Sequence, residues 1–139
     1  MPKLLVRPSE GLSRVSTTKP YAMAIRSRGD FIFLMGQGGY DLDGTFVGLG
    51  DPGAQAAQAC RNIKQLLIEA GATIDDLCKL SVYMTDVVFR GPVYTSIERE
   101  LDGITICRTG IVVDSLGPPE YLVEIDAYAV AARSVNSVS

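Results

Sequence analysis

The segment YLVEIDAYAVAA, residues 121–132, decides how this chain folds, because its residues alternate in character along its length. Successive side chains of a β-strand point to opposite faces, so the segment predicts a strand with one apolar and one mixed face. The apolar face carries Val123, Ile125, Ala127 and Ala129, and the mixed face carries Leu122, Glu124, Asp126, Tyr128 and Val130. The mixed face holds too many apolar groups to stay in water. We therefore expect a neighbouring subunit to cover it; the alternative is a moderately apolar open sheet on a monomer.

Two helices are expected to cover the apolar face. Residues 52–70 carry apolar side chains at spacings of three and four, which is typical of an amphipathic helix. Asp51 is placed to cap the N-terminus of this helix, and Gly71 is placed to end it. Residues 91–103 repeat the pattern more briefly and predict a second, shorter helix.

Five further strands are predicted from short apolar or alternating runs. They are residues 3–7, 21–27, 31–37, 79–85 and 109–116. The Gly-Asp turn within RGD, residues 28–30, joins the second run to the third, so we expect these two strands to pair as a β-hairpin. The chain of 139 residues is therefore expected to form a single α+β domain, residues 1–139, with two helices on one face of a six-stranded sheet. Its tail, about residues 134–139, is expected to be frayed.

Composition and charge exclude several classes of function. The net charge of −3 argues against a nucleic-acid-binding surface. The chain has no histidine, which excludes Ser-His-Asp and Cys-His catalysis and zinc sites built on imidazole. Cys60, Cys78 and Cys107 are spaced neither as a disulfide framework nor as metal ligands, and no metal or cofactor is expected. No apolar run is long enough to span a membrane and no signal peptide is visible, so we expect a cytoplasmic protein.

One cation stands at the head of a strand that otherwise suits burial. Arg108 precedes the apolar run at residues 111–113. A guanidinium group keeps its charge and presents a planar fork of donors, so removing it from water without a partner is costly. Its partner is either a carboxylate of the protein, such as Glu124, Asp114 or Asp126, or the carboxylate of a ligand bound bidentately.

A recognisable pattern runs through three stretches of the chain. They are PYAMAIRSRGDFIFLMGQ (residues 20–37), AQAAQACRNIKQLLIEAGATIDDLCKLSVYMTD (residues 54–86) and CRTGIVVDSLGPPEYLVEIDAYAVA (residues 107–131). Together they resemble the RidA family, also called YjgF/YER/UK, over roughly residues 15–133. The arginine strand followed by VEIDAYA is the most specific part of this resemblance.

The resemblance implies a fold, an assembly and an activity. The fold would be chorismate-mutase-like, with a mixed sheet, and the assembly a homotrimer with its sites at the subunit interfaces. The activity would be hydrolysis of reactive enamines and imines to 2-keto acids with release of ammonia, without a metal or an organic cofactor. The partners would be a small carboxylate-bearing substrate and further copies of the chain, with no nucleic acid and no membrane.

The resemblance also assigns roles to individual residues. Arg108 would bind the substrate carboxylate, and the main-chain carbonyl of Cys107 would accept from the substrate nitrogen. Glu124 would orient or deprotonate the attacking water, and Tyr21 would wall the pocket from a neighbouring subunit.

The family pattern predicts further pocket residues, two of which match it and two of which differ from it. Gly36 and Gln37 would line the pocket after the third strand. Met35 stands where the family often has serine, and Tyr94 stands where its second helix usually has asparagine. Tyr94 would either narrow the pocket or pack the helix. The Cys-Arg-Thr sequence at residues 107–109 resembles the 2-aminomuconate deaminase branch.

Three functions therefore remain open on sequence. The first is a general enamine/imine deaminase, and the second is a dedicated deaminase of a 2-aminomuconate-like acid. The third is a trimeric, non-catalytic binder of small carboxylates. An endoribonuclease activity, also attributed to parts of the family, is disfavoured by the acidic charge and the absence of histidine.

Overall fold

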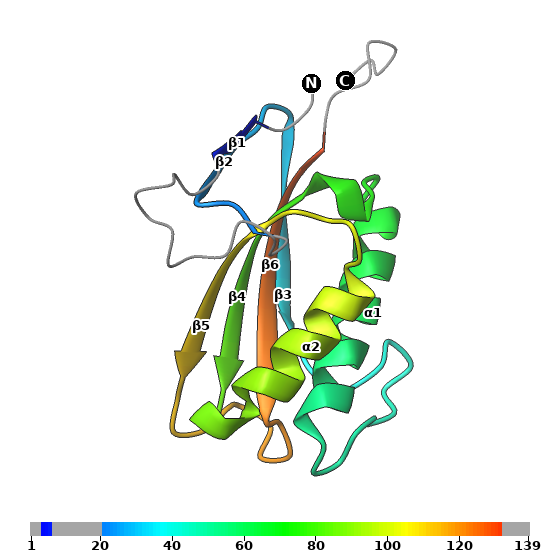
Figure 1. Cartoon of the computed structure of the whole chain (residues 1–139). Helices are drawn as coiled ribbons and strands as arrows, with labels where there is room; N and C mark the ends of the chain where they lie inside the picture. Colours follow the sequence, from blue (N-terminus) through cyan, green and yellow to red (C-terminus); the bar gives the residue numbers. More distant parts are fainter. Residues whose placement is uncertain (1–3, 7–20, 132–139) are drawn as a thin grey trace, which may run out of the picture.

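The computed structural model describes residues 4–6 and 21–131, and its elements follow the predicted order (Figure 1). The strands are β1 (Leu4–Val6), β2 (Ala24–Arg26), β3 (Asp30–Gln37), β4 (Leu77–Met84), β5 (Cys107–Val112) and β6 (Val123–Ala131). The helices are α1 (Pro52–Glu69) and α2 (Arg90–Glu100), with short 3₁₀ turns at η2 (Ile74–Asp76) and η3 (Val87–Phe89). The tail predicted at residues 134–139 lies outside the described residues.

The main sheet has four strands in the order β3-β6-β4-β5. β6 runs antiparallel to both of its neighbours, whereas β5 runs parallel to β4. Parallel neighbours need a crossover connection, and α2 supplies it between β4 and β5. Both helices lie on the same face of this mixed sheet (Figure 1), as predicted.

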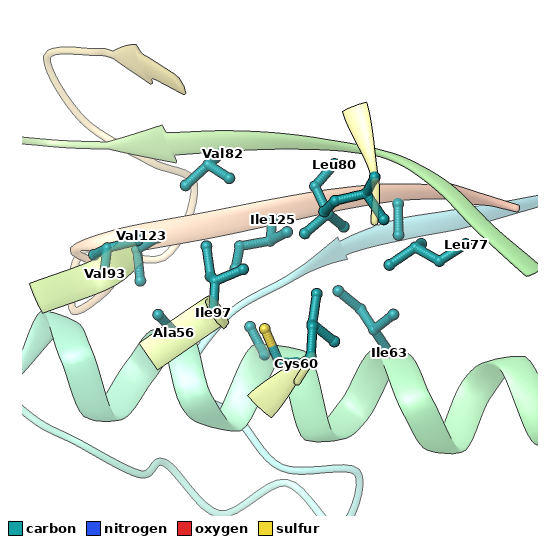
Figure 2. Packing of buried hydrophobic residues seen from close by; sticks show 14 of the residues in the cluster. Ala56, Cys60, Ile63, Leu77, Leu80, Val82, Val93, Ile97, Val123 and Ile125 are labelled. Atoms are coloured by element: carbon teal, nitrogen blue, oxygen red, sulfur yellow. The ribbon is translucent and has the colours of Figure 1, made fainter. Parts of the chain in front are cut away.

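The hydrophobic core fills the space between that face and the two helices (Figure 2). Along β6, Val123, Ile125 and Ala127 are fully buried, which confirms the face that the helices were expected to cover. From the helices, Ile63 of α1 and Ile97 of α2 meet these side chains at 0% and 1% exposure. Removing this apolar surface from water is the main force that holds the helices to the sheet.

The longer helix begins and ends where the sequence indicated. The Oδ1 atom of Asp51 accepts a hydrogen bond from the backbone N–H of Ala54 at 3.0 Å, and Pro52 occupies the first turn. Gly71 follows the last turn with a φ of 84°, a left-handed conformation that glycine adopts without steric cost.

The predicted hairpin is wrong. β2 and β3 flank a turn at Gly29, but β2 pairs with β1, and β3 pairs with β6. The strands therefore divide into a two-stranded sheet and the four-stranded sheet, instead of forming one sheet of six. Turn residues fix where a chain reverses, whereas pairing is decided by which ladder is longer and buries more apolar surface, and β6 offers β3 that ladder.

The second face of the four-stranded sheet, which we call the outer face, is rich in exposed apolar side chains. On β3, Phe31 and Phe33 are each 73% exposed and Met35 is 82% exposed. The ring of Phe33 packs edge-on against that of Tyr128 on β6, with centroids 5.9 Å apart. Exposed apolar groups gathered in this way are typical of a surface that another protein chain covers.

Candidate functional site

An open pocket lies between α2 and strands β4 and β5. It brings together Arg108, Tyr21 and Tyr94, three of the residues that the sequence singled out. The lining residues are Tyr21, Met84, Val87, Arg90, Gly91, Tyr94, Thr95, Glu98, Arg108, Gly110 and Val112.

Arg108 lies on the helix-covered side of the sheet. β5 sets it beside Leu80 of β4, whose side chain is fully buried, and neighbouring residues of paired strands point to the same face. The side chain of Arg108 is 13% exposed. Its guanidinium carbon lies 4.2 Å from the centre of the Tyr94 ring and 5.9 Å from that of Tyr21. Aromatic faces stabilise a cation that has lost part of its water.

The carboxylate that meets Arg108 is not one of those predicted. Nη2 of Arg108 donates to Oε1 of Glu98 at 3.3 Å, and this is its one ion pair within residues 21–131. Glu124 and Asp126 belong to the opposite face of the sheet, and Asp114 makes no pair with Arg108 in that part of the chain. A guanidinium group has five N–H donors, so most of its donor capacity remains for an acceptor in the pocket.

The pocket wall opposite β5 is one face of α2. Arg90, Tyr94 and Glu98 follow one another at a spacing of four, which aligns them along the helix. The guanidinium carbon of Arg90 lies 5.5 Å from the centre of the Tyr94 ring. A Cβ on Gly110 would overlap the hydroxyl of Tyr94, so glycine at this position lets the ring lie directly against β5.

Glu124 and Gly36 lie together on the outer face. Glu124 stands beside Tyr83 of β4, on the side away from Leu80, and a Cβ on Gly36 would collide with its carboxylate. Burial, and then the neighbouring charge of Asp126, raise the pKa of Glu124 above its usual range. A single chain thus keeps Glu124 and Arg108 on opposite sides of the sheet.

Cys107 faces away from Arg108, because successive side chains of a strand point to opposite faces. It pairs with Lys79 of β4, whose Nζ donates to Oγ1 of Thr109 at 2.7 Å on the outer face. The thiol therefore does not enter the pocket, although the backbone of Cys107 stands next to Arg108.

Gln37 does not line the pocket in one chain. A β-bulge between Leu34 and Gln37 shifts the register of β3, and this turns Gln37 toward α1. Its Oε1 accepts from Nδ2 of Asn62 at 3.2 Å, and its Nε2 donates to the carbonyl of Met35 at 2.9 Å. The side chain of Gln37 fixes β3 to α1.

Within one chain Tyr21 already lines the pocket that holds Arg108, and its backbone bridges to Ile106. Its expected contribution to the site of a neighbouring subunit stays a prediction, and two other residues were missed. Glu98 and Arg90 were not singled out. The signal that would have found them is their spacing of four on either side of Tyr94.

Residues 4–6 and 21–131 contain neither a candidate metal site nor a membrane-spanning helix. No three or more acidic or thiol side chains gather there in a way that would hold a metal ion. No helix in that part of the chain is long and apolar enough to span a bilayer.

Comparison with known proteins gives a consistent result. The sequence model of the family described as Endoribonuclease L-PSP matches residues 11–131. A RutC family protein from Pyrococcus abyssi is 32% identical over 110 residues, which cover 79% of this chain and 85% of that protein. A Yersinia pestis protein of unknown function, from the conserved Rid protein family, superposes with a TM-score of 0.79 at 25% identity, covering 94% of this chain and 99% of the other. A putative endoribonuclease from Thermotoga maritima superposes with a TM-score of 0.68 at 26% identity, covering 84% and 90% of the two chains.

Proposed function

The chain belongs to the RidA (YjgF/YER/UK) family, and from that premise we propose that it hydrolyses enamines and imines of small carboxylic acids to 2-keto acids. The observation that carries this proposal is the environment of Arg108. Its guanidinium group is largely buried in a pocket, stacks on Tyr94 and donates one hydrogen bond to Glu98. Such a group binds the carboxylate that these substrates share.

The proposed reaction needs only water. The oxygen of a water molecule bonds to the imine carbon, and the carbon–nitrogen bond then breaks to leave a keto group and ammonia. Both protons of this water end on the departing nitrogen: one is transferred when the oxygen bonds to carbon, and the second when the carbon–nitrogen bond breaks, and a carboxylate carries them. Glu124 is the proposed carboxylate, because burial and the neighbouring charge of Asp126 raise its pKa, which makes it a better proton acceptor than an ordinary glutamate. The carbonyl of Cys107 would hold the imine nitrogen beside Arg108.

The proposed active unit is a homotrimer whose sites form where two chains meet. Arg108 opens toward α2, whereas Glu124 and Gly36 open on the outer face, so one site would combine Arg108 of one chain with Glu124 of the next. The exposed Phe33 and Met35 support this assembly, since a neighbouring chain would remove them from water.

Two narrower alternatives keep the same pocket. A dedicated deaminase of a 2-aminomuconate-like acid is favoured by the pocket's second arginine, Arg90. A non-catalytic binder of small carboxylates would use Arg108 and leave Glu124 without a role. An endoribonuclease has less support, because the chain is acidic and lacks histidine.

An ammonia assay on imines made in situ by an amino-acid oxidase tests the proposal. The purified protein should speed the appearance of ammonia and 2-keto acid above the enzyme-free rate. Arg108→Lys should lower kcat/KM by roughly 10- to 100-fold, because a point charge does not replace a bidentate fork.

The matched control is Arg61→Lys. Arg61 lies on α1, is half exposed and pairs with Glu100 at 2.9 Å outside the pocket. This variant should keep wild-type kinetics. Equal rates with and without the wild-type protein would refute the deaminase; if a 2-keto acid still bound, the non-catalytic alternative would replace it.

A further inference from the structure

The pocket holds a second cation that carboxylate capture by Arg108 does not use. Arg90 and Arg108 both lie against the ring of Tyr94, with guanidinium carbons 5.5 Å and 4.2 Å from its centre. We propose that Arg90 binds a second carboxylate at the far end of the substrate, so that the site prefers short dicarboxylic acids. This inference rests on the proposed function, because it takes Arg108 as the group that binds the first carboxylate.

The charges around the pocket favour a doubly anionic ligand. Two arginines and one glutamate are the charged residues of its lining, and the glutamate, Glu98, already pairs with Arg108. Within residues 21–131 no carboxylate lies at ion-pair distance from Arg90. Arg90 is exposed, so a ligand can reach it without displacing a protein partner.

The position of Arg90 in α2 strengthens the argument. It is the first residue of α2, directly after the 3₁₀ turn η3, and the first turn of α2 carries no acidic residue. Contact with Tyr94 holds the guanidinium group at the pocket, and its N–H donors remain for a carboxylate.

The geometry also places both arginines within reach of one short ligand. Because both guanidinium carbons stand close to one ring, their separation cannot exceed the total of their distances to its centre. One short dicarboxylic acid that crosses the face or edge of Tyr94 can therefore contact both arginines.

Two product-like acids of equal chain length test the proposal. 2-Oxoglutarate carries a carboxylate where 2-oxopentanoate ends in a methyl group. Isothermal titration of the wild-type protein should show tighter binding of 2-oxoglutarate by roughly 5- to 10-fold. Arg90→Gln should remove this preference and leave the affinity for 2-oxopentanoate unchanged, whereas Arg90→Lys should retain part of it.

Arg99→Gln is the matched control. It removes one positive charge from the same helix at a residue that bonds to Ser96 and does not line the pocket, so the preference should survive. If the preference for 2-oxoglutarate persists in Arg90→Gln, the proposed role of Arg90 is refuted. It is also refuted if the wild type binds 2-oxopentanoate and shows no such preference. Neither outcome affects carboxylate binding by Arg108. If neither acid binds the wild type, carboxylate capture by Arg108 fails as well, and with it the proposed function.

Discussion

The two faces of the four-stranded sheet differ in what one chain supplies to them. The helix-covered face is complete: Leu80 and Ile125 are fully buried beneath α1 and α2, and Arg108 meets Glu98 and Tyr94 from the same chain. The outer face carries exposed aromatic side chains together with Glu124, whose pKa is raised. The first face accounts for the stability of the fold, whereas the second is the face at which the proposed chemistry would require another copy of the chain.

The largest expected effect comes from placing a charge on the outer face. Phe33→Glu should convert the proposed trimer to monomers and abolish imine hydrolysis, because a carboxylate would have to be buried at the interface. Analytical ultracentrifugation gives the mass. Ile68→Glu, at a 60% exposed position on α1, should leave both mass and activity unchanged. A Phe33→Glu protein of unaltered mass would place the interface elsewhere.

Glu124→Gln should remove catalysis while leaving binding intact. The amide cannot carry a proton between water and the leaving nitrogen, so kcat should fall by roughly 10²- to 10⁴-fold. Affinity for a 2-keto acid should stay at the wild-type level, because Arg108 is untouched. Titration calorimetry and the ammonia assay measure the two quantities, and equal turnover in both proteins would remove Glu124 from the mechanism.

Truncation of a side chain should destabilise the two faces unequally. Ile125→Ala leaves a cavity in the core and should lower the free energy of unfolding by about 2–5 kcal/mol. Met35→Ala, at an 82% exposed position, should change the free energy of unfolding of an isolated chain by about 0.5 kcal/mol or less. Urea denaturation of dissociated protein measures both. Similar losses would show that the outer face also packs within one chain.

The sequence predicted those parts of the fold that depend on a pattern of neighbouring residues. Alternation along β6 fixed its buried face, and apolar spacing with Asp51 and Gly71 fixed α1. Pairing could not be predicted in the same way, because the turn at Gly29 says nothing of which ladder buries more surface. The two short N-terminal strands, β1 and β2, were therefore predicted to belong to the main sheet, whereas they form a separate two-stranded sheet.

The site could be predicted only in part for the same reason: patterns of neighbouring residues do not show which residues far apart in the sequence come into contact. Arg108 stood out because a cation in an apolar strand needs a partner. Its actual partner, Glu98, comes from a helix whose orientation toward β5 no local pattern reveals. The bulge that turns Gln37 to α1 was equally hidden, because nothing in the alternation of β3 marks where the extra residue is inserted.

The smallest expected effect is a pH dependence of stability. Since the pKa of Glu124 is raised on folding, its stabilising contribution is fully present below the ordinary glutamate pKa and is lost as pH rises through the raised value. Glu124→Gln should therefore unfold at the same or a higher temperature than the wild type at pH 7, and this advantage should shrink toward pH 4. An advantage that grows as the solution is acidified would contradict the sign of the shift.

The most direct measurement is complementation between two variants that each lack one residue of the proposed site. The Arg108→Lys and Glu124→Gln proteins are dissociated into single chains, mixed in equal amounts and allowed to reassemble, and imine hydrolysis is measured before and after. If each site takes Arg108 from one chain and Glu124 from its neighbour, about a quarter of the sites in the mixture regain both residues, and activity returns in that proportion. If both residues act within one chain, no site regains the pair, and the mixture stays as inactive as its two components.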